Sequence, residues 1–415
     1  MQGLNDLVSK TKEVIKSGQY RQSTLTLYDY GWRGICEYFS DYETTWFSSV
    51  LVTQYIMETR QRYVAGDISL SKFKLIRKTA TMLIQCHETG SIQWNKIPSW
   101  DNVDFKTPLY SRVMCNYIKD LNDKEYGFGT IKLCKTVTKK FLTFLEQKKT
   151  YDLSVLKPDT VSHFILYASK DYQPTSMRTV CTALRSFLRF LVSAELIPNS
   201  LVLSIPSSFA RKTTIIPTIT RQEEDQMLAA IDRNTMMGKR DYAILLIALR
   251  LGIRSVDITN LKLEQVKWQR NTIELIQQKT GHILMLPLLA DVGNAIIDYL
   301  IHGRHASSEP YVFLRSHAPY TKLSGNAAVY HVVSGYMEKA HIRQNKGERK
   351  GAHCLRHTVA SRLLSSETPL PIISSILGHA DKNSALVYLS TDLEHLRSCA
   401  LGLAGIEVVK EELKP

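Results

Sequence analysis

The stretch "GAHCLRHTVASRLL", residues 351–364, places two histidines and an arginine within five residues. Read as a helix, it carries His353, Arg356 and His357 at spacings i, i+3 and i+4, so the three side chains lie on one face. Taken alone, the stretch is compatible with a metal site, a phosphate site or an ordinary polar helix surface. Features elsewhere in the chain decide among these three.

The composition favours a polyanionic partner. Lys and Arg number 53 against 39 Asp and Glu, which gives a formal charge of +14, while 44% hydrophobic and 22% charged residues are typical of a globular protein. Nucleic acid is the usual partner of so basic a chain, and a protein that is merely basic is the alternative. A length of 415 residues exceeds one compact core, so two or three domains are expected.

The seven cysteines are scattered and form no CxxC pair, which argues against a disulfide framework or a Cys-rich zinc module and indicates a reducing compartment. The first residues, "MQGLNDLVSKTKEVIKSG", are amphipathic and lack the apolar core of a signal peptide. No run of about 18 apolar residues is present. We therefore expect a cytoplasmic protein without a membrane partner.

Residues 1–205 have helical periodicity and an internal repeat. "STLTLYDYGWRGICEYFSDY" (23–42) and "GTIKLCKTVTKKFLTFLEQKK" (129–149) both carry apolar residues at helical spacing. The similar stretches that begin at Tyr20 and Tyr126 are 106 residues apart. This spacing predicts two copies of one small helical module, over residues 1–105 and 107–205.

Two linkers, 95–108 and 205–220, carry prolines and no periodicity. After the second, Thr220 and Glu223 form a capping-box pattern that opens a helix. "NTIELIQQ" and "HILMLPL", joined by "KTG", predict a β-hairpin, and "PIISSIL" predicts a short helix. The third region, about 215–404, is thus expected to be mostly helical with one small sheet, followed by a tail at 405–415.

Groups suited to a phosphodiester occur at four places in this third region: Arg254 with Asp257, Lys279 in the hairpin turn, His353 with Arg356, and His379 with Tyr388. Each has an ordinary explanation when taken singly, such as a surface ion pair, a solvated lysine or a core tyrosine. A zinc site fits poorly, because no glutamate lies between the two histidines and Arg356 would repel a divalent ion. An anion fits the same groups better, since a guanidinium pairs with two oxygens at once.

In order, type and spacing, these residues resemble the pattern of the tyrosine recombinase (phage-integrase) family: Arg, Lys in a hairpin, His-x-x-Arg, His or Trp, then Tyr. Here the pattern stands as Gly-Ile-Arg254, Lys279-Thr-Gly, His353-Cys-Leu-Arg356-His357, Leu-Gly-His379 and Tyr388. The resemblance covers about residues 215–400, with a helical module at 107–205 where the family has its core-binding module. The first module is an extension beyond the shortest members.

The resemblance implies a role for each residue. Arg254 and Arg356 would hold the non-bridging oxygens of the scissile phosphate. Tyr388 would attack the phosphorus and leave a 3′-phosphotyrosine and a free 5′-hydroxyl, with His353 as its base, since an unperturbed tyrosine has a pKa of about 10. Lys279 would protonate the leaving oxygen and His379 would hydrogen-bond the phosphate. Asp257 would orient its neighbours, and His357 would have a supporting structural role.

The resemblance also implies the architecture and the partners. The fold would be mainly α, with helical DNA-binding modules and a mostly helical catalytic domain that contains a small antiparallel β-sheet. Residues 1–105 would form a SAM-like module that binds arm sites or extends the clamp, 107–205 the core-binding module and 215–404 the catalytic domain. Double-stranded DNA would be the partner, held by a homo-tetramer on two sites with accessory DNA-bending proteins, and no metal or other cofactor is implied.

The leading hypothesis is therefore a site-specific DNA recombinase, the integrase or transposase of a mobile element. A type IB topoisomerase shares the same pocket and would relax supercoils without exchanging partners. A DNA-binding regulator that keeps the fold without activity is the non-enzymatic alternative. The complete set from Arg254 to Tyr388 argues against the regulator, because binding alone requires neither a nucleophile nor its general acid.

Overall fold

The computed structural model describes residues 2–92, 105, 107–206, 217–343, 345, 348 and 350–378. The chain divides into two compact units, Met1–Pro98 together with Ile215–Pro415, and Ser99–Thr214. Both boundaries fall within the linkers expected at 95–108 and 205–220. Because the first and third predicted domains belong to one unit, the division into 1–105, 107–205 and 215–404 stays a prediction.

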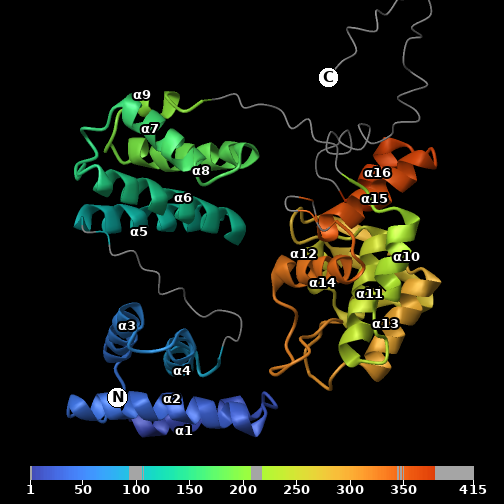
Figure 1. Ribbon diagram of the computed structural model, residues 1–415, viewed down its shortest axis with the longest axis horizontal. Helices are drawn as coiled ribbons and strands as arrows, with labels where there is room; N and C mark the ends of the chain where they lie inside the picture. The colour runs from blue at the N-terminus through green and yellow to red at the C-terminus, as the bar shows by residue number, and fades with distance from the viewer. Residues whose placement is uncertain are drawn as a thin grey trace, which may run out of the picture. The chain divides into compact units, whose positions relative to one another are not determined.

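The predicted mainly helical fold is confirmed (Figure 1). The helices of the first two modules are α1 (Leu4–Lys16), α2 (Gln22–Asp41), α3 (Ser49–Ala65), α4 (Leu70–Thr89), α5 (Pro108–Asp123), α6 (Phe128–Gln147), α7 (Pro158–Ser169), α8 (Pro174–Ser193) and α9 (Ser200–Leu203). The third region contains α10 (Arg221–Ala229), α11 (Met236–Leu251), α12 (Ser255–Thr259), α13 (Ala290–His302), α14 (Gly325–Lys339), α15 (Ala352–Ser365) and α16 (Leu370–Leu377).

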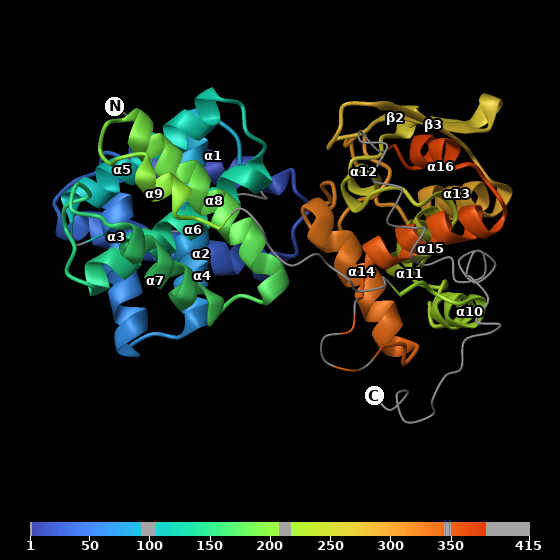
Figure 2. The ribbon, with the colours of Figure 1, turned by 90° about the horizontal axis from the view of Figure 1, so that it is seen from above.

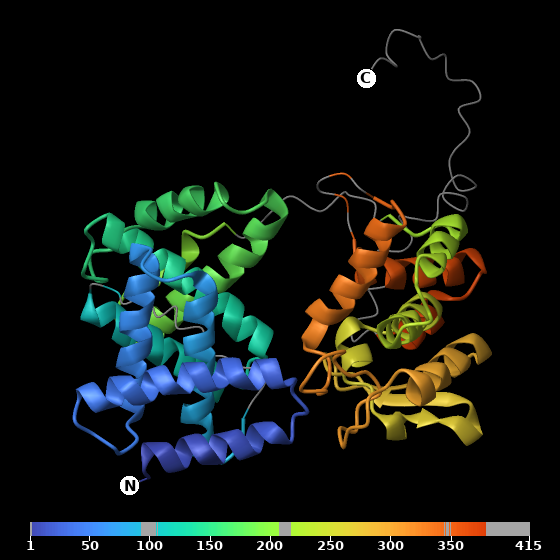
Figure 3. The same ribbon diagram turned by 60° about the horizontal axis from the view of Figure 1, so that its bottom comes forward.

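The first two modules repeat one four-helix arrangement, of which α1–α4 are the blue helices in Figure 3. The buried side chains of α1 recur in α5 after 106 residues, in the pairs Leu4 and Tyr110, Leu7 and Val113, Val8 and Met114, Thr11 and Tyr117, and Ile15 and Leu121. The same spacing separates two pairs of residues with positive φ, Gln19 and Glu125, and Glu43 and Lys149. A duplication predicts that equivalent positions of the two modules share burial and backbone conformation, as these pairs do.

The third region is organised around α11. Its run "AILLIALRL" (243–251) is apolar on nearly every side, and a helix of that kind is stable only when other elements cover it. Helices α13, α14 and α15 pack against it (Figure 2). None of the helices in the described ranges combines the length and the apolar character needed to cross a membrane.

The predicted hairpin is present as strands β2 (Thr272–Ile276) and β3 (Ile283–Pro287), and α16 lies against β3. The pairs Ile273–Leu286 and Leu275–Leu284 face the core, while Met285 and Ile276 are exposed, as the alternation of the sequence predicts. The prediction missed a third strand, β1 (Val266–Lys267), which pairs with β2 in antiparallel orientation. Two residues are too few to show periodicity.

A left-handed turn at Gly252 (φ +60°) ends α11 and places Arg254 at the N-cap of α12. A Cβ atom at this glycine would lie 3.1 Å from the Leu377 side chain and 3.3 Å from that of Val359. The position therefore needs glycine both for its backbone conformation and for the close approach of α15 and α16.

An ion-pair network joins helices that are distant in the sequence. Glu224 on α10 is buried and forms ion pairs with Arg250 of α11 and, at 2.6 Å, with Arg362 of α15. The predicted capping box of Thr220 and Glu223 is present at the start of α10. Burial alone would raise the pKa of the Glu224 carboxyl, but hydrogen bonds from the two arginines outweigh burial and lower that pKa. Glu224 therefore helps to fix α15, which carries the 351–364 motif.

We predict that Glu224→Gln lowers the free energy of unfolding of the chain by about 2 kcal/mol at pH 7. Breaking a fully buried pair costs about 3–5 kcal/mol, and the side chains of Arg250 and Arg362 are 29% and 30% exposed, which reduces the loss. Because the folded-state pKa is lowered, the contribution of Glu224 is present above about pH 4.3 and is lost as the pH falls further. Urea denaturation at pH 7 and pH 4 measures the free energy of unfolding, and Asp225→Asn, at an exposed position of the same helix, is the control. Equal stabilities of wild type and Glu224→Gln at pH 7 would contradict the prediction.

Candidate active site

Four of the predicted site residues line one cavity of about 250 Å³. Arg254 comes from the start of α12, Lys279 from the β2–β3 turn, and His353 and Arg356 from the first turns of α15. The sequence separates these positions by up to 102 residues, and the turn at Gly252 and the hairpin bring them together. The structure thus places the groups expected to hold one phosphate around one hollow.

Both arginines are anchored by oxygen atoms of the protein. The Arg356 guanidinium, which is buried, donates to the Gly252 carbonyl (2.8 Å) and to the Leu377 carbonyl (2.6 Å). Arg254 donates from Nη2 to the carbonyl of Gly378 (2.9 Å) and from Nη1 to Oε1 of Gln277 (2.7 Å). The carbonyls at the ends of α11 and α16 therefore fix two cations at neighbouring positions.

Gln277 is a site residue that the sequence analysis missed. Its side chain is 1% exposed, accepts hydrogen bonds from Arg254 and from the Thr280 hydroxyl (2.7 Å each), and donates to the Leu377 carbonyl (3.2 Å). It thus links the first arginine, the lysine turn and α16. The available signal was the strand alternation, because Gln277 occupies the inward position that follows Ile273 and Leu275.

Asp257 is buried and fixes the start of the hairpin turn. Its Oδ1 atom accepts a hydrogen bond from the backbone N–H of Gln278 (2.8 Å), next to Lys279. Burial raises the pKa of the Asp257 carboxyl, against the opposing influence of that hydrogen bond and of the positive charges of Arg254 and Arg356. The surface ion pair considered from the sequence is therefore wrong, and the expected orienting role stays a prediction that this geometry supports.

His353 and His357 contact each other directly. Their Nε2 atoms lie 3.1 Å apart and the ring planes meet at 82°, so one nitrogen donates a hydrogen bond to the other. His357 is buried, whereas His353 is exposed at the cavity. The i, i+4 spacing has therefore produced a histidine pair in which the buried member orients the exposed one.

Lys279 lies in the turn between β2 and β3. Its side chain is exposed and lines the cavity, so its amine can contact a ligand bound there. His379 and Tyr388, the two remaining predicted residues, lie outside the described residues. Helix α16 ends at Leu377 with Gly378 as its C-cap, and the carbonyls of these two residues hold the two arginines. The chain thus passes directly from these anchors to His379.

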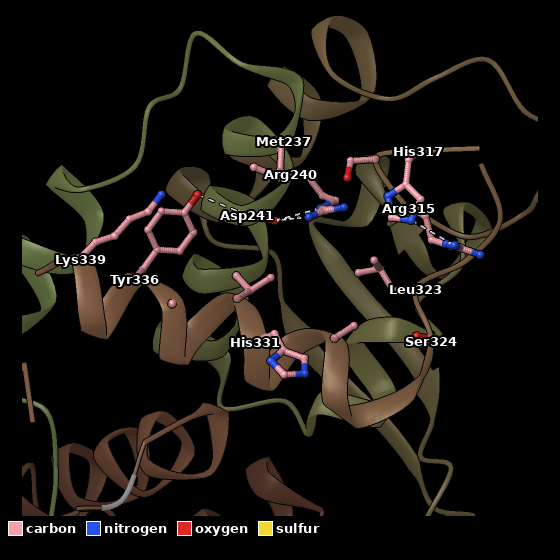
Figure 4. Close-up of a pocket in the computed structure, with 14 residues that line it drawn as sticks. Met237, Arg240, Asp241, Arg315, His317, Leu323, Ser324, His331, Tyr336 and Lys339 are labelled. Carbon is pink, nitrogen blue, oxygen red and sulfur yellow. Dashed lines mark hydrogen bonds and ion pairs between the residues drawn. The ribbon is translucent and has the colours of Figure 1, made fainter. Parts of the chain in front are cut away.

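A second, larger hollow of about 600 Å³ lies between the start of α11, α14 and residues 315–324 (Figure 4). Arg240 and Asp241 form a buried ion pair at 2.7 Å in its wall, and the Tyr336 hydroxyl donates to Asp241 (3.3 Å). Burial raises the pKa of the Asp241 carboxyl. None of the predicted site residues within the described ranges lines this hollow, so it is separate from the arginine cavity.

The arginine cavity is suited to an anion. Two guanidinium groups, an amine and an imidazole line this cavity. The positive charges of both arginines act to lower the pKa of the neighbouring Asp257 carboxyl, although burial outweighs them. Planar, fixed guanidinium groups match the oxygens of a phosphate. Among the described residues, no cluster of three or more His, Cys, Asp or Glu side chains has the arrangement of a metal site.

Comparison with known proteins relates this geometry to a family. Residues 217–395 match the phage integrase family model. The chain is 32% identical over 313 residues to a putative integrase/recombinase of Sinorhizobium fredii, y4rA, an alignment that covers 75% of each protein. A tyrosine recombinase XerC from Anoxybacillus flavithermus is 26% identical over 308 residues, which cover 72% of this chain and 96% of that protein.

Solved structures have the same fold at low identity. Lambda integrase residues 75–356, bound as a dimer to a core site, superpose with a TM-score of 0.55 at 15% identity, over 73% of this chain and 99% of that one. The XerH recombinase in a post-cleavage complex with its difH substrate gives 0.55 at 17% identity, over 84% and 93%. The predicted fold class is thus confirmed. The Sinorhizobium fredii relative shares 32% identity over three quarters of both proteins, which shows that the chain belongs to the phage integrase family of tyrosine recombinases, enzymes of site-specific recombination.

Proposed function

We propose that the chain is the integrase or transposase of a mobile element and that it cuts and rejoins duplex DNA through Tyr388. The observation that carries this proposal is the cavity in which Arg254, Lys279, His353 and Arg356 converge. Relatives described as putative integrase/recombinases of Sinorhizobium fredii support the integrase part of this proposal. Because the substrate is cellular DNA, the enzyme acts in the cytoplasm, at the nucleoid when bound.

In the proposed reaction, one scissile phosphate occupies the cavity. Arg254 and Arg356 hold its non-bridging oxygens and stabilise the charge of the pentacovalent transition state. The Tyr388 oxygen bonds to phosphorus as its proton passes to His353, and the bond from phosphorus to the 5′-oxygen breaks. Lys279 gives its proton to that 5′-oxygen, and His379 hydrogen-bonds the phosphate.

The resulting 3′-phosphotyrosine conserves the energy of the phosphodiester bond, so the free 5′-hydroxyl of a second strand can reverse the step without ATP. Exchange between two duplexes requires four active subunits, so we propose a homo-tetramer on two DNA sites, assisted by accessory bending proteins. Residues 107–205 would bind the core site. Lys132, Lys135 and Arg178 are exposed on α6 and α8, where they can contact phosphates.

We predict that Tyr388→Phe abolishes covalent attachment to DNA while DNA binding stays within about twofold of wild type. The phenyl ring lacks the attacking oxygen but changes no charge. The test incubates both proteins, with EDTA present, on nicked duplexes from the flanks of the gene, and looks for a denaturation-resistant protein–DNA band. An adduct formed by Tyr388→Phe would show that another residue is the nucleophile.

We further predict that Gln277→Met slows adduct formation by roughly 10- to 100-fold, because Arg254 loses its acceptor and a small misplacement of a catalytic group is costly. The dissociation constant for the duplex should change less than threefold, which separates positioning from binding. The matched control is Gln278→Met, whose exposed side chain makes no hydrogen bond in the described part of the chain. A wild-type rate of adduct formation by Gln277→Met would show that Gln277 does not position Arg254.

The inactive regulator and the topoisomerase make different predictions in the same assays. A regulator would form no adduct with any duplex it binds. A topoisomerase would relax supercoiled plasmid of arbitrary sequence, whereas a site-specific recombinase acts only where its site is present. The convergence of four catalytic-type groups on one cavity supports an enzyme over a regulator.

A further inference from the structure

The contact between His353 and His357 determines which nitrogen of His353 can react. The two Nε2 atoms lie 3.1 Å apart, which is a hydrogen-bond distance, and the ring planes meet at 82°. A neutral imidazole carries one proton on its two nitrogens, so one of the facing Nε2 atoms donates and the other accepts. The direction of this one hydrogen bond therefore fixes the tautomer of both rings.

Neutral rings allow two arrangements. In the first, His353 donates from Nε2, and its Nδ1 atom has a lone pair that can take up a proton. In the second, His357 is the donor, and Nδ1 of His353 carries a proton that it can only donate. The role of base that the proposed reaction gives to His353 is open to the first arrangement alone.

The lining of the arginine cavity favours the first arrangement. Three cationic side chains share this hollow with the imidazole, and each has N–H donors and no acceptor: Arg254, Lys279 and Arg356. Among the described residues of the lining none is acidic, so no carboxylate there fixes the imidazole as an aspartate does in a serine-protease triad. A lone pair on the cavity side of His353 complements these donors, whereas a further N–H group does not.

His357 is well placed to accept the proton. Its side chain is 4% exposed and lies one helical turn after His353 on the same face of α15, so packing fixes the position of its ring. His353 lies in the first turn of the same helix and is exposed at the cavity. A buried nitrogen of fixed position thus faces Nε2 of His353, and Nδ1 is the nitrogen that serves a ligand.

We propose that His357 is a positioning residue whose Nε2 lone pair accepts the Nε2 proton of His353 and thereby assigns Nδ1 of His353 as the basic atom. The inference rests on the proposed function, because it takes His353 to be the base. As the Tyr388 oxygen bonds to phosphorus, its proton moves to Nδ1. His353 then carries a positive charge and two N–H groups, of which Nε2–H still donates to His357. When the step reverses, Nδ1 returns the proton to the tyrosine oxygen.

Two substitutions of similar size separate acceptance of this proton from filling of the space. In His357→Gln the side-chain carbonyl oxygen can lie near the position of Nε2 and accept the same proton, whereas His357→Leu has no acceptor. We expect His357→Leu to form the adduct on the nicked duplex roughly 10- to 100-fold more slowly than wild type, and His357→Gln to stay within about fivefold. The dissociation constant for the duplex should change less than about threefold in both variants, because the loss falls on the chemical step.

The matched pair decides between positioning and packing. Equal rates of adduct formation by His357→Gln and His357→Leu would show that the accepting atom has no part in the reaction. Urea denaturation of both variants measures their folding, and a loss of stability common to both cannot produce the expected difference between their rates.

The tautomers can also be measured in the unchanged chain without DNA. Nitrogen-15 NMR distinguishes a protonated ring nitrogen from one with a lone pair, and spectra of His353→Gln and His357→Gln assign the signals. At about pH 8, above the ordinary histidine pKa of about 6.5, we expect a proton on Nε2 of His353 and on Nδ1 of His357. A proton on Nδ1 of His353 would overturn the inference even if wild type forms the adduct. The expected tautomers without an adduct would instead contradict the proposed function.

Discussion

The active site depends on hydrogen bonds from two guanidinium groups to oxygens at the ends of helices. Arg356 reaches the carbonyls of Gly252 and Leu377, and Arg254 reaches that of Gly378. Carbonyls at helix C-termini have no partner within their own helix and carry partial negative charge, so they are suited to hold cations. Two arginines that would otherwise repel each other are thus fixed side by side.

This arrangement explains why the surrounding backbone is so specific. Gly252 and Gly378 both have positive φ, and a Cβ atom at Gly378 would lie 2.2 Å from the Gln277 side-chain nitrogen. The close approach lets Gln277 bridge α16 and the arginine, while Asp257 fixes the neighbouring turn that carries Lys279. The glycines, the buried amide and the buried carboxylate therefore serve one purpose, which is to present fixed positive charge to an anion.

Much of this site could be predicted from the sequence, because Arg254, Lys279, His353 and Arg356 form a recognisable order of chemical types. Strand alternation places Gln277 on the inward face, but its link to Arg254 and to the Leu377 carbonyl, 100 positions away, arises only in the folded chain. Likewise, β1 is too short to produce a pattern.

In the proposed reaction, the two arginines neutralise the charge of one scissile phosphate. The most direct test replaces one non-bridging oxygen of that phosphate with a methyl group, which removes its charge while keeping the bond that Tyr388 attacks. Arg356→Ala should form little adduct with the normal substrate and should regain much of the lost rate with the neutral methylphosphonate. If Arg356→Ala is equally slow on both substrates while remaining folded, Arg356 does not act by neutralising the phosphate charge.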